Sequence, residues 1–236
     1  MAFSVKKSVR SCSLVLLFLS IGCFALAAEN KPIYSIDFSS PGSNNPRDWL
    51  KSKGYECEKD ATSDDELALS FSGGALVLEA KSRLFGLIIN KDLHLDNAKT
   101  IRITWGVDQF PDGANYEKKV NNEAIMVYVY YGNKSLSSDS LFIPNGPYFI
   151  GLFPGRFETL NKPFIGHHFT QGGRFVCIAH PELNKTIVSE FDLKKGFENC
   201  FGNVESTVPY ISSIALEVET SSSGPSKAFI KKIEIF

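Results

Sequence analysis

Tyr128 and Tyr130 stand at alternate positions of a strongly apolar run, and polar side chains of complementary chemistry occur at Arg102 and Asp108. An aromatic ring offers a flat apolar face that can stack on the CH groups of a pyranose ring. Arginine donates and aspartate accepts the hydrogen bonds that sugar hydroxyls need. These residues indicate a surface suited to carbohydrate, although alternate tyrosines are also common on any half-buried strand.

Alternation along two predicted strands decides which faces carry these residues. In residues 124–131 the aliphatic side chains, among them Val127 and Val129, share one face, and the tyrosines share the other. In residues 100–108 the bulky apolar side chains again share a face and leave Arg102 and Asp108 opposite. If the two strands are neighbours, one sheet presents both polar sets on its outer surface, and we expect a ligand to bind there.

The segment 146–168 is dense in glycine, proline and aromatic residues and also contains Arg156, His167 and His168. Recognition residues are frequent in long loops on a rigid sandwich, so Arg156 joins the predicted ligand site. In an enzyme, Arg156, His167 and His168 would be the candidates for a lyase-like reaction. Packing of the loop by its aromatic residues is the alternative interpretation.

Paired carboxylates are the other candidate catalytic groups. Glycosidases hold two acidic side chains on either side of the bond that they cleave. Glu190 with Asp192, and Glu217 with Glu219, each place two acids on one face of a predicted strand. The first pair lacks the third acid of the glycosidase pattern, because Lys195 stands in its place, and a solvated acidic face is the simpler interpretation of the second pair. The sequence favours a protein that is not an enzyme.

Cysteine and oxygen donors suggest two further features. An oxidising compartment permits one disulfide, and we predict that it joins Cys177 to Cys200, closing a short loop for a gain of about 3 kcal/mol. Cys57 would stay a free thiol, and three free thiols are the alternative. Residues 108–115 could hold a structural calcium ion, although their Asp, Asn and Gly also form ordinary turns. No other cofactor is expected.

Composition sets limits on the class of protein. The 236 residues are 43% hydrophobic, with 25 Lys and Arg against 26 Asp and Glu. The apolar content excludes a disordered chain, and the lack of a basic excess excludes a general nucleic-acid binder.

The first residues have the pattern of a secretory leader. Lys6, Lys7 and Arg10 precede an apolar stretch that ends in small residues, which predicts a signal peptide over residues 1–27. A lipoprotein leader with Cys23 as the modified residue is the alternative. We therefore expect an exported chain, periplasmic or extracellular, with one domain over residues 28–236 and no transmembrane segment after cleavage.

Hydrophobic alternation with a period of two dominates the rest of the chain, punctuated about every ten residues by Gly, Pro, Asn or Asp. Short helices are predicted near residues 45–50 and 192–201, each with a capping residue at its start. An opening strand at 33–38 precedes ten further predicted strands: 66–71, 75–80, 84–90, 100–107, 124–131, 148–153, 173–179, 186–192, 211–219 and 228–236. So many strands with so little helix predict two packed sheets.

Four segments resemble a bacterial exported family of unknown function: residues 101–105, 122–131, 214–220 and 228–233. Members of that family place an acidic pair before an Arg-Val-Tyr-Val strand and an Asp-Thr-Asp-Asn-like turn near the C-terminus. Here Asn122 and Glu123 replace the acidic pair, Met126 replaces the arginine, and residues 219–222 replace the turn. The resemblance covers roughly residues 66–236 and implies a sandwich like those of carbohydrate-binding modules, without supplying an activity.

The sequence thus predicts an all-β protein with a jelly-roll-like, two-sheet antiparallel sandwich and one or two short helices. We expect an exported, non-enzymatic protein that binds a glycan or a cell-envelope component and has no nucleic-acid partner. A polysaccharide-active lyase or hydrolase on the same scaffold, and a structural or protein-interaction domain, are the alternatives. The predicted ligand residues are Arg102, Asp108, Tyr128, Tyr130 and Arg156.

Overall fold

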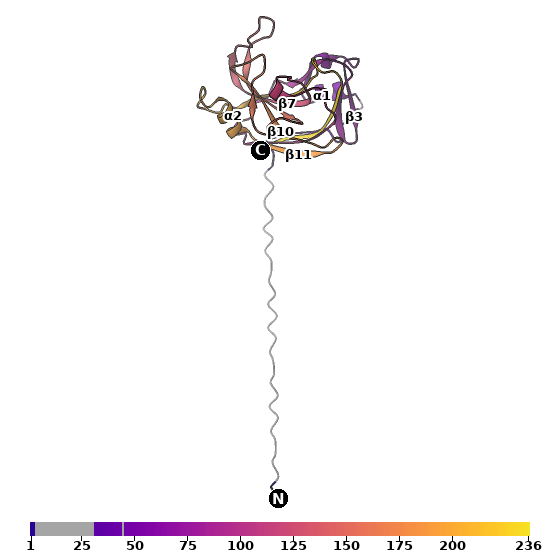
Figure 1. Cartoon of the computed structure of the whole chain (residues 1–236), viewed down its shortest axis with the longest axis vertical. Coiled ribbons are helices and arrows are strands. Elements are labelled where there is room, and N and C mark those ends of the chain that lie inside the picture. The colour runs from indigo at the N-terminus through magenta and orange to yellow at the C-terminus, as the bar shows by residue number, and fades with distance from the viewer. Residues whose placement is uncertain (3–30, 44) are drawn as a thin grey trace. The chain divides into compact units, whose positions relative to one another are not determined.

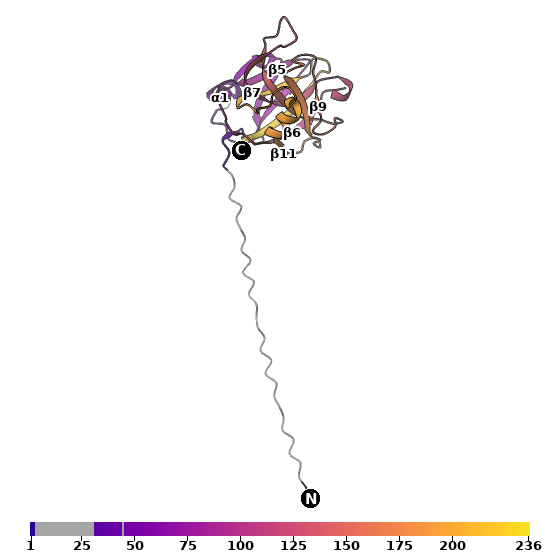
Figure 2. The same cartoon turned by 90° about the vertical axis from the view of Figure 1, so that its left-hand side faces the viewer.

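The computed structural model describes residues 1–2, 31–43 and 45–236. Apart from its first two residues, the predicted signal peptide lies outside the described residues, as does Cys23. Figures 1 and 2 show that residues 31–236 form a strand-rich body, and Figure 1 places the short helices α1 and α2 towards opposite sides of it. No helix among the described residues is long and apolar enough to cross a membrane.

One sheet has six strands, and its neighbours all pair antiparallel. Its strand order is β11-β6-β13-β4-β3, and β1 also pairs with β13. In that order the strands are β11 (Ile187–Asp192), β6 (Thr100–Gln109), β13 (Ser226–Ile235), β4 (Ala75–Ala80) and β3 (Leu67–Ser72), with β1 at Tyr34–Asp37. β6 and β13 therefore form the centre of this sheet.

The second sheet has seven strands in the order β2-β5-β12-β7-β8-β10-β9. These strands are β2 (Glu56–Lys59), β5 (Phe85–Asn90), β12 (Ile211–Glu219), β7 (Glu123–Leu136), β8 (Gly146–Pro154), β10 (Gly173–Ala179) and β9 (Pro163–Phe164). All neighbours are antiparallel except β8 and β10, which are parallel. The chain can leave β8 and re-enter in the same direction because a long connection containing β9 joins the two strands.

The main core lies between the sheets and is built from one face of each. Ile101, Ile103 and Trp105 of β6 meet Val127 and Val129 of β7 in one cluster, and all five are fully buried. The indole N–H of Trp105 donates to the Ser189 hydroxyl, so the largest core side chain has no unpaired polar atom. This is the aliphatic interior that the alternation predicted.

Two short helices and two 3-10 turns complete the fold. They are α1 (Pro46–Ser52), α2 (Leu193–Phe201), η1 (Asp60–Thr62) and η2 (Tyr116–Lys118). Asn45 caps α1 by accepting the N–H groups of Arg47 and Asp48, and Asp192 caps α2 by accepting that of Lys195. Helix α2 buries Phe197 and Phe201 against the core.

The predicted fold class is confirmed: strands dominate, they form two packed sheets, and helices are few and short. The parallel pairing of β8 with β10 differs from the fully antiparallel expectation. Two short strands, β2 and β9, were not predicted, because runs of four and two residues give too little alternation to read.

Candidate functional site

The predicted ligand surface is split by the topology, which corrects our expectation that its two strands are neighbours. β6 pairs with β11 and β13, whereas β7 pairs with β12 and β8 in the other sheet. Because the aliphatic faces of β6 and β7 meet in the core, their polar faces point away from each other. Arg102 and the two tyrosines therefore lie on opposite outer surfaces of the sandwich.

Neither side of the split surface is an open binding platform. Arg102 Nε donates to Glu190 Oε1 at 2.7 Å, and its guanidinium lies 4.8 Å from the ring centre of Phe236. Tyr128 faces outward from β7 as predicted but is only 6% exposed. Its ring packs edge-on against Phe149 at 5.0 Å and lies 5.7 Å from that of Tyr130. The tyrosines are thus members of a packed aromatic layer.

Asp108 and Arg156, the other two predicted ligand residues, do come together. They line one hollow of about 450 Å³, which we call the Arg156 hollow. Its wall consists of Asp108, Gln109, Phe110, Gly155, Arg156, Phe157, His180, Pro181 and Leu183. The end of β6, the loop after β8 and the loop after β10 contribute these residues, and Asn184 N–H donates to Val107 O at 2.9 Å to hold the last loop against β6.

The Arg156 hollow combines charge with exposed aromatic surface. The Arg156 guanidinium lies 4.9 Å from the ring centre of Phe157 and 5.6 Å from that of Phe110. Phe157 is 60% exposed, so its ring is accessible to a ligand. Such contacts between a cation and a ring are worth about 0.5 to 1 kcal/mol at exposed sites, and they orient Arg156 between the two rings.

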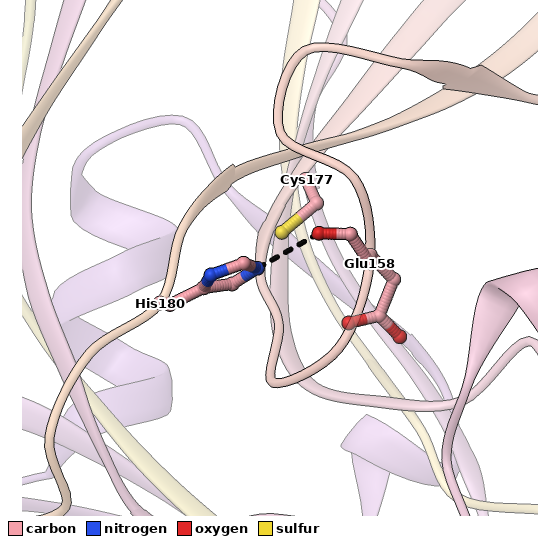
Figure 3. Close-up of side chains that lie close together, drawn as sticks. All are labelled: Glu158, Cys177 and His180. Atoms are coloured by element: carbon pink, nitrogen blue, oxygen red, sulfur yellow. Dashed lines mark hydrogen bonds between the residues drawn. The ribbon is translucent and has the colours of Figure 1, made fainter.

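Three metal-ligating side chains lie together next to this hollow. Ligand atoms of Glu158, Cys177 and His180 all lie within 4.8 Å of one another (Figure 3). His180 Nε2 donates to the backbone carbonyl of Glu158 at 2.8 Å, the dashed contact of Figure 3. Burial raises the pKa of the Cys177 thiol to about 11, so at neutral pH this sulfur is a thiol that could become a thiolate only on binding a cation.

The predicted disulfide is absent from the structure, which has Cys57, Cys177 and Cys200 as free thiols. Along β10, Val176 faces the main core, whereas Cys177 joins a second cluster with Phe153 and Tyr116. Cys200 on α2 packs against the main core. The seven-stranded sheet therefore separates the two sulfurs, and a disulfide could not form without rearranging β10 or α2.

A pair of carboxyl groups is buried on the outer face of the seven-stranded sheet. Glu123 is 2% exposed and Glu217 is 4% exposed. In the pairing of β7 with β12, Glu217 lies opposite Met126 and Glu219 lies opposite Glu123, with a register shift between them. Both residues between Glu123 and Met126 face the core, so this bulge turns Glu123 outward beside Glu217.

Aromatic side chains cover this pair, and together they form what we call the acid–aromatic layer. It consists of Glu123, Glu217, Tyr116, Tyr128, Phe149, Phe153, Phe164 and Phe175. Tyr116 stacks on Phe153 at 4.4 Å and also contacts Phe164 and Phe175 at 5.7 and 5.5 Å between ring centres. The layer is therefore closed by rings that pack on one another.

The pKa values of both carboxyl groups are raised, which favours their protonated forms. Tyr116 donates to Glu123 Oε2 at 2.6 Å, whereas Glu123 Oε1 is buried and has no hydrogen-bond partner among the described residues. Burial raises the pKa of Glu217 to about 8. Burial, followed by the charge of Glu217, raises the pKa of Glu123 well above its usual range. Two adjacent buried anions would be too costly, so at neutral pH the pair keeps at least one proton.

Tyr116 links the Arg156 hollow to the acid–aromatic layer. Its backbone N–H donates to Glu158 Oε1 at 3.1 Å, and its hydroxyl donates to Glu123. Glu158 Oε2 in turn accepts the backbone N–H groups of Arg156 and Phe157 at 2.9 and 3.0 Å. Tyr116 therefore holds Glu158, which fixes the backbone of Arg156 and Phe157 in the wall of the hollow, and it also holds the Glu123 carboxyl group of the layer.

The remaining predicted residues do not assemble into a site. His167 and His168 are exposed in the loop between β9 and β10, and neither lines the Arg156 hollow. In the predicted calcium loop, Asn115 Oδ1 accepts the N–H of Lys118 and so caps η2. The calcium ion stays a prediction.

No family model and no curated protein matches the chain. Solved structures that align with it include carbohydrate-binding modules, the kind of sandwich that the sequence resemblance implied. A CBM29-2 mutant complexed with mannohexaose is 9% identical, with 86% of this chain and 91% of that chain covered and a TM-score of 0.37. The module BiXyn10A CBM1 is 8% identical, with 87% and 98% covered and a TM-score of 0.37.

The catalytic domain of Humicola grisea Cel12A, in complex with a soaked thio cellotetraose, also aligns. It is 12% identical, with 78% of this chain and 92% of that chain covered and a TM-score of 0.39. All three TM-scores lie below 0.5, so these alignments carry no argument about the ligand or activity of this chain. The functional argument rests on its own residues.

Sequence reasoning missed Tyr116, Glu123, Glu158 and His180, and assigned Glu217 to a solvated face. Alternation does place Glu217 opposite the core residues Leu216 and Val218, which is the signal that was available. What could not be read was the pairing of β12 with β7, which brings Glu217 beneath aromatic rings. His180 and Glu158 belong to loops, where no periodicity reports on position.

Proposed function

We propose that the chain is an exported, non-enzymatic glycan-binding protein and that the Arg156 hollow is its binding site. The observation that carries this proposal is the exposed ring of Phe157 beside the guanidinium of Arg156, with Asp108 on the same wall. A ring that stacks on a sugar, a donor and an acceptor are the three groups that carbohydrate recognition uses. A hollow of about 450 Å³ is within the usual size range of small-ligand sites.

The test is binding of a panel of neutral and uronate-containing oligosaccharides, measured by glycan array and then by calorimetry. Phe157→Ala and Arg156→Ala should each weaken binding at least about tenfold, which corresponds to about 1.4 kcal/mol. Matched controls exist on other surfaces. Phe142→Ala removes a ring that is 96% exposed at another loop, and Arg102→Ala removes an arginine that lies outside the wall of the hollow.

Both controls should bind like the unaltered chain. The proposal is wrong if no glycan of the panel binds, or if the two variants of the hollow bind as tightly as their controls.

Hydrolysis of glycosidic bonds is the second candidate function, and the Glu123–Glu217 pair is the observation that favours it. A glycosidase works with one protonated and one ionised carboxyl group, and the raised pKa values of Glu123 and Glu217 favour the protonated one. We rank it second because both groups are almost fully buried beneath Tyr116 and its neighbours. Release of reducing ends from a polysaccharide, abolished by Glu217→Gln and retained in Phe157→Ala, would make this function the correct one.

A further inference from the structure

We propose that Glu158, Cys177 and His180 form a zinc site beside the Arg156 hollow. Cys177 and His180 are separated by two residues at the end of β10, and Glu158 comes from the loop after β8. Thiolate, imidazole and carboxylate are the three side-chain ligands that zinc uses in proteins. Glu158 and Cys177 do not line the hollow, and zinc binding can be tested in the absence of glycan.

The loop that carries Glu158 is fixed against β10 before any ion binds. Gly155 N–H donates to Ala179 O and Asn161 N–H donates to Cys177 O, each at 2.9 Å. The side chains of Glu158 and Cys177 therefore have little freedom to separate. A preorganised site loses less conformational entropy when an ion binds, so the short chain segment between these hydrogen bonds favours binding.

The space beside Gly155 is bordered by two of the three ligands. A Cβ atom at position 155 would lie 2.3 Å from Glu158 Oε2 and 2.8 Å from Cys177 Sγ. The carboxylate and the sulfur thus approach the same point, and only a residue without a side chain leaves that point free. Figure 3 shows the His180 ring on the other side of the sulfur, from a separate loop.

Each ligand can supply an electron pair to the ion. Glu158 Oε1 accepts one N–H and keeps one acceptor position free, whereas Oε2, beside Cys177 Sγ, already accepts two. The His180 nitrogen that lies nearer to the sulfur in Figure 3 is Nε2, which donates to Glu158 O. A bound ion would replace this hydrogen bond and take the Nε2 lone pair, with the ring proton on Nδ1.

Binding is a simple exchange at the sulfur. The Cys177 S–H bond breaks, the sulfur electron pair forms the bond to Zn²⁺, and the proton goes to solvent. No oxidant or reductant is needed. Three protein ligands leave a fourth position for water or a bound molecule, as in open zinc sites. His180 is exposed and lines the hollow, which gives the ion a route from solvent.

The test uses the chain after treatment with a chelator, titrated with Zn²⁺ by calorimetry and with Co²⁺ by absorption spectroscopy in the absence of glycan. We expect one Zn²⁺ per chain with a Kd in the micromolar range or below, and a cobalt spectrum with a sulfur-to-metal charge-transfer band. His180→Ala and Cys177→Ser should each weaken Zn²⁺ binding at least tenfold, and Cys177→Ser should also remove the band. His168→Ala, an exposed histidine outside the site, is the matched control and should bind like the unaltered chain.

His180→Ala keeps the test decisive if Cys177→Ser does not fold, because His180 is exposed. Gly155→Ala adds a methyl group to the space between two ligands without removing either, and it should also weaken binding. No saturable Zn²⁺ binding, a cobalt spectrum without the sulfur band, or equal binding by His180→Ala and His168→Ala would overturn the proposal. Glycan binding by the unaltered chain after treatment with the chelator would leave the proposed function intact in any of these cases.

Discussion

The Arg156 hollow and the acid–aromatic layer use similar side chains under opposite conditions of hydration. In the hollow, Arg156 and the ring of Phe157 are exposed, and the charged groups keep contact with water. In the layer, Glu123 and Glu217 are buried under rings, and protonation must remove the charge that water would otherwise solvate. The hollow therefore offers groups to a ligand at little cost in stability, whereas the layer depends on every one of its contacts.

Tyr116→Ala should produce the largest change, because it breaks the layer. The substitution removes a buried ring from its stack on Phe153 and removes the hydroxyl that donates to Glu123. Deleting a large buried side chain costs about 3 to 5 kcal/mol in the free energy of unfolding. Urea unfolding monitored by circular dichroism measures this change, with Phe142→Ala as an exposed-ring control. A loss below about 1 kcal/mol would mean that the layer is not a packed unit.

The raised pKa of Glu217 predicts how the stability changes with pH. In the unfolded chain both carboxyl groups titrate near a pKa of about 4.3, whereas burial in the folded chain raises the pKa of Glu217 to about 8. A raised folded pKa means that the protonated folded form is favoured. The stabilisation of the folded chain by protonated Glu217 is complete below about pH 4 and is lost as the pH rises through about 8. From about pH 5 to pH 8 the free energy of unfolding should fall by about 1.4 kcal/mol per pH unit because of the proton on Glu217.

Unfolding curves at several pH values in this range measure the slope, and a matched pair of variants isolates the contribution of the layer. Glu217→Gln replaces the protonated acid by a neutral group of the same shape, so its stability should depend on pH less steeply by about that amount. Glu56→Gln alters an exposed carboxylate and should keep the slope of the unaltered chain. Equal slopes for all three chains would show that the carboxyl pair is not protonated.

Tyr116→Phe should have an intermediate effect, since it keeps the ring and removes only the hydroxyl. Glu123 Oε2 would then lose its donor while staying buried, which costs about 1 to 3 kcal/mol. A double-mutant cycle with Glu123→Gln measures the coupling between the two groups, which we expect to lie between about 0.5 and 3 kcal/mol. Additive effects would place the hydroxyl outside the network of the layer.

The main features of the fold could be predicted because they depend on local alternation. Val127 and Val129 are core residues in the structure, and the caps Asn45 and Asp192 begin the two helices. In each of these cases the information lies within a few residues of sequence, and burial of an apolar face leaves one consistent orientation.

The candidate sites could be predicted only in part, because they depend on which strands are neighbours. Asp108 and Arg156 meet at one end of the sandwich, but Arg102 is separated from the tyrosines because β6 and β7 belong to different sheets. The bulge that turns Glu123 outward has no signal in the alternation, since it adds one residue to a run that is apolar on both faces. Strand order and register are long-range properties, and a single sequence does not state them.

Phe157→Ala should produce the smallest change in stability of these substitutions. It tests the hollow, whereas the preceding substitutions test the layer. Its ring is 60% exposed, so truncation removes little buried area, and the free energy of unfolding should stay within about 0.5 kcal/mol of the unaltered chain. The same substitution should weaken glycan binding about tenfold, because the ring is available for stacking. Unfolding and calorimetry on one preparation measure both quantities. A variant that loses stability along with affinity would show that Phe157 supports the loop, and the ligand site would then have to be sought on another wall of the hollow.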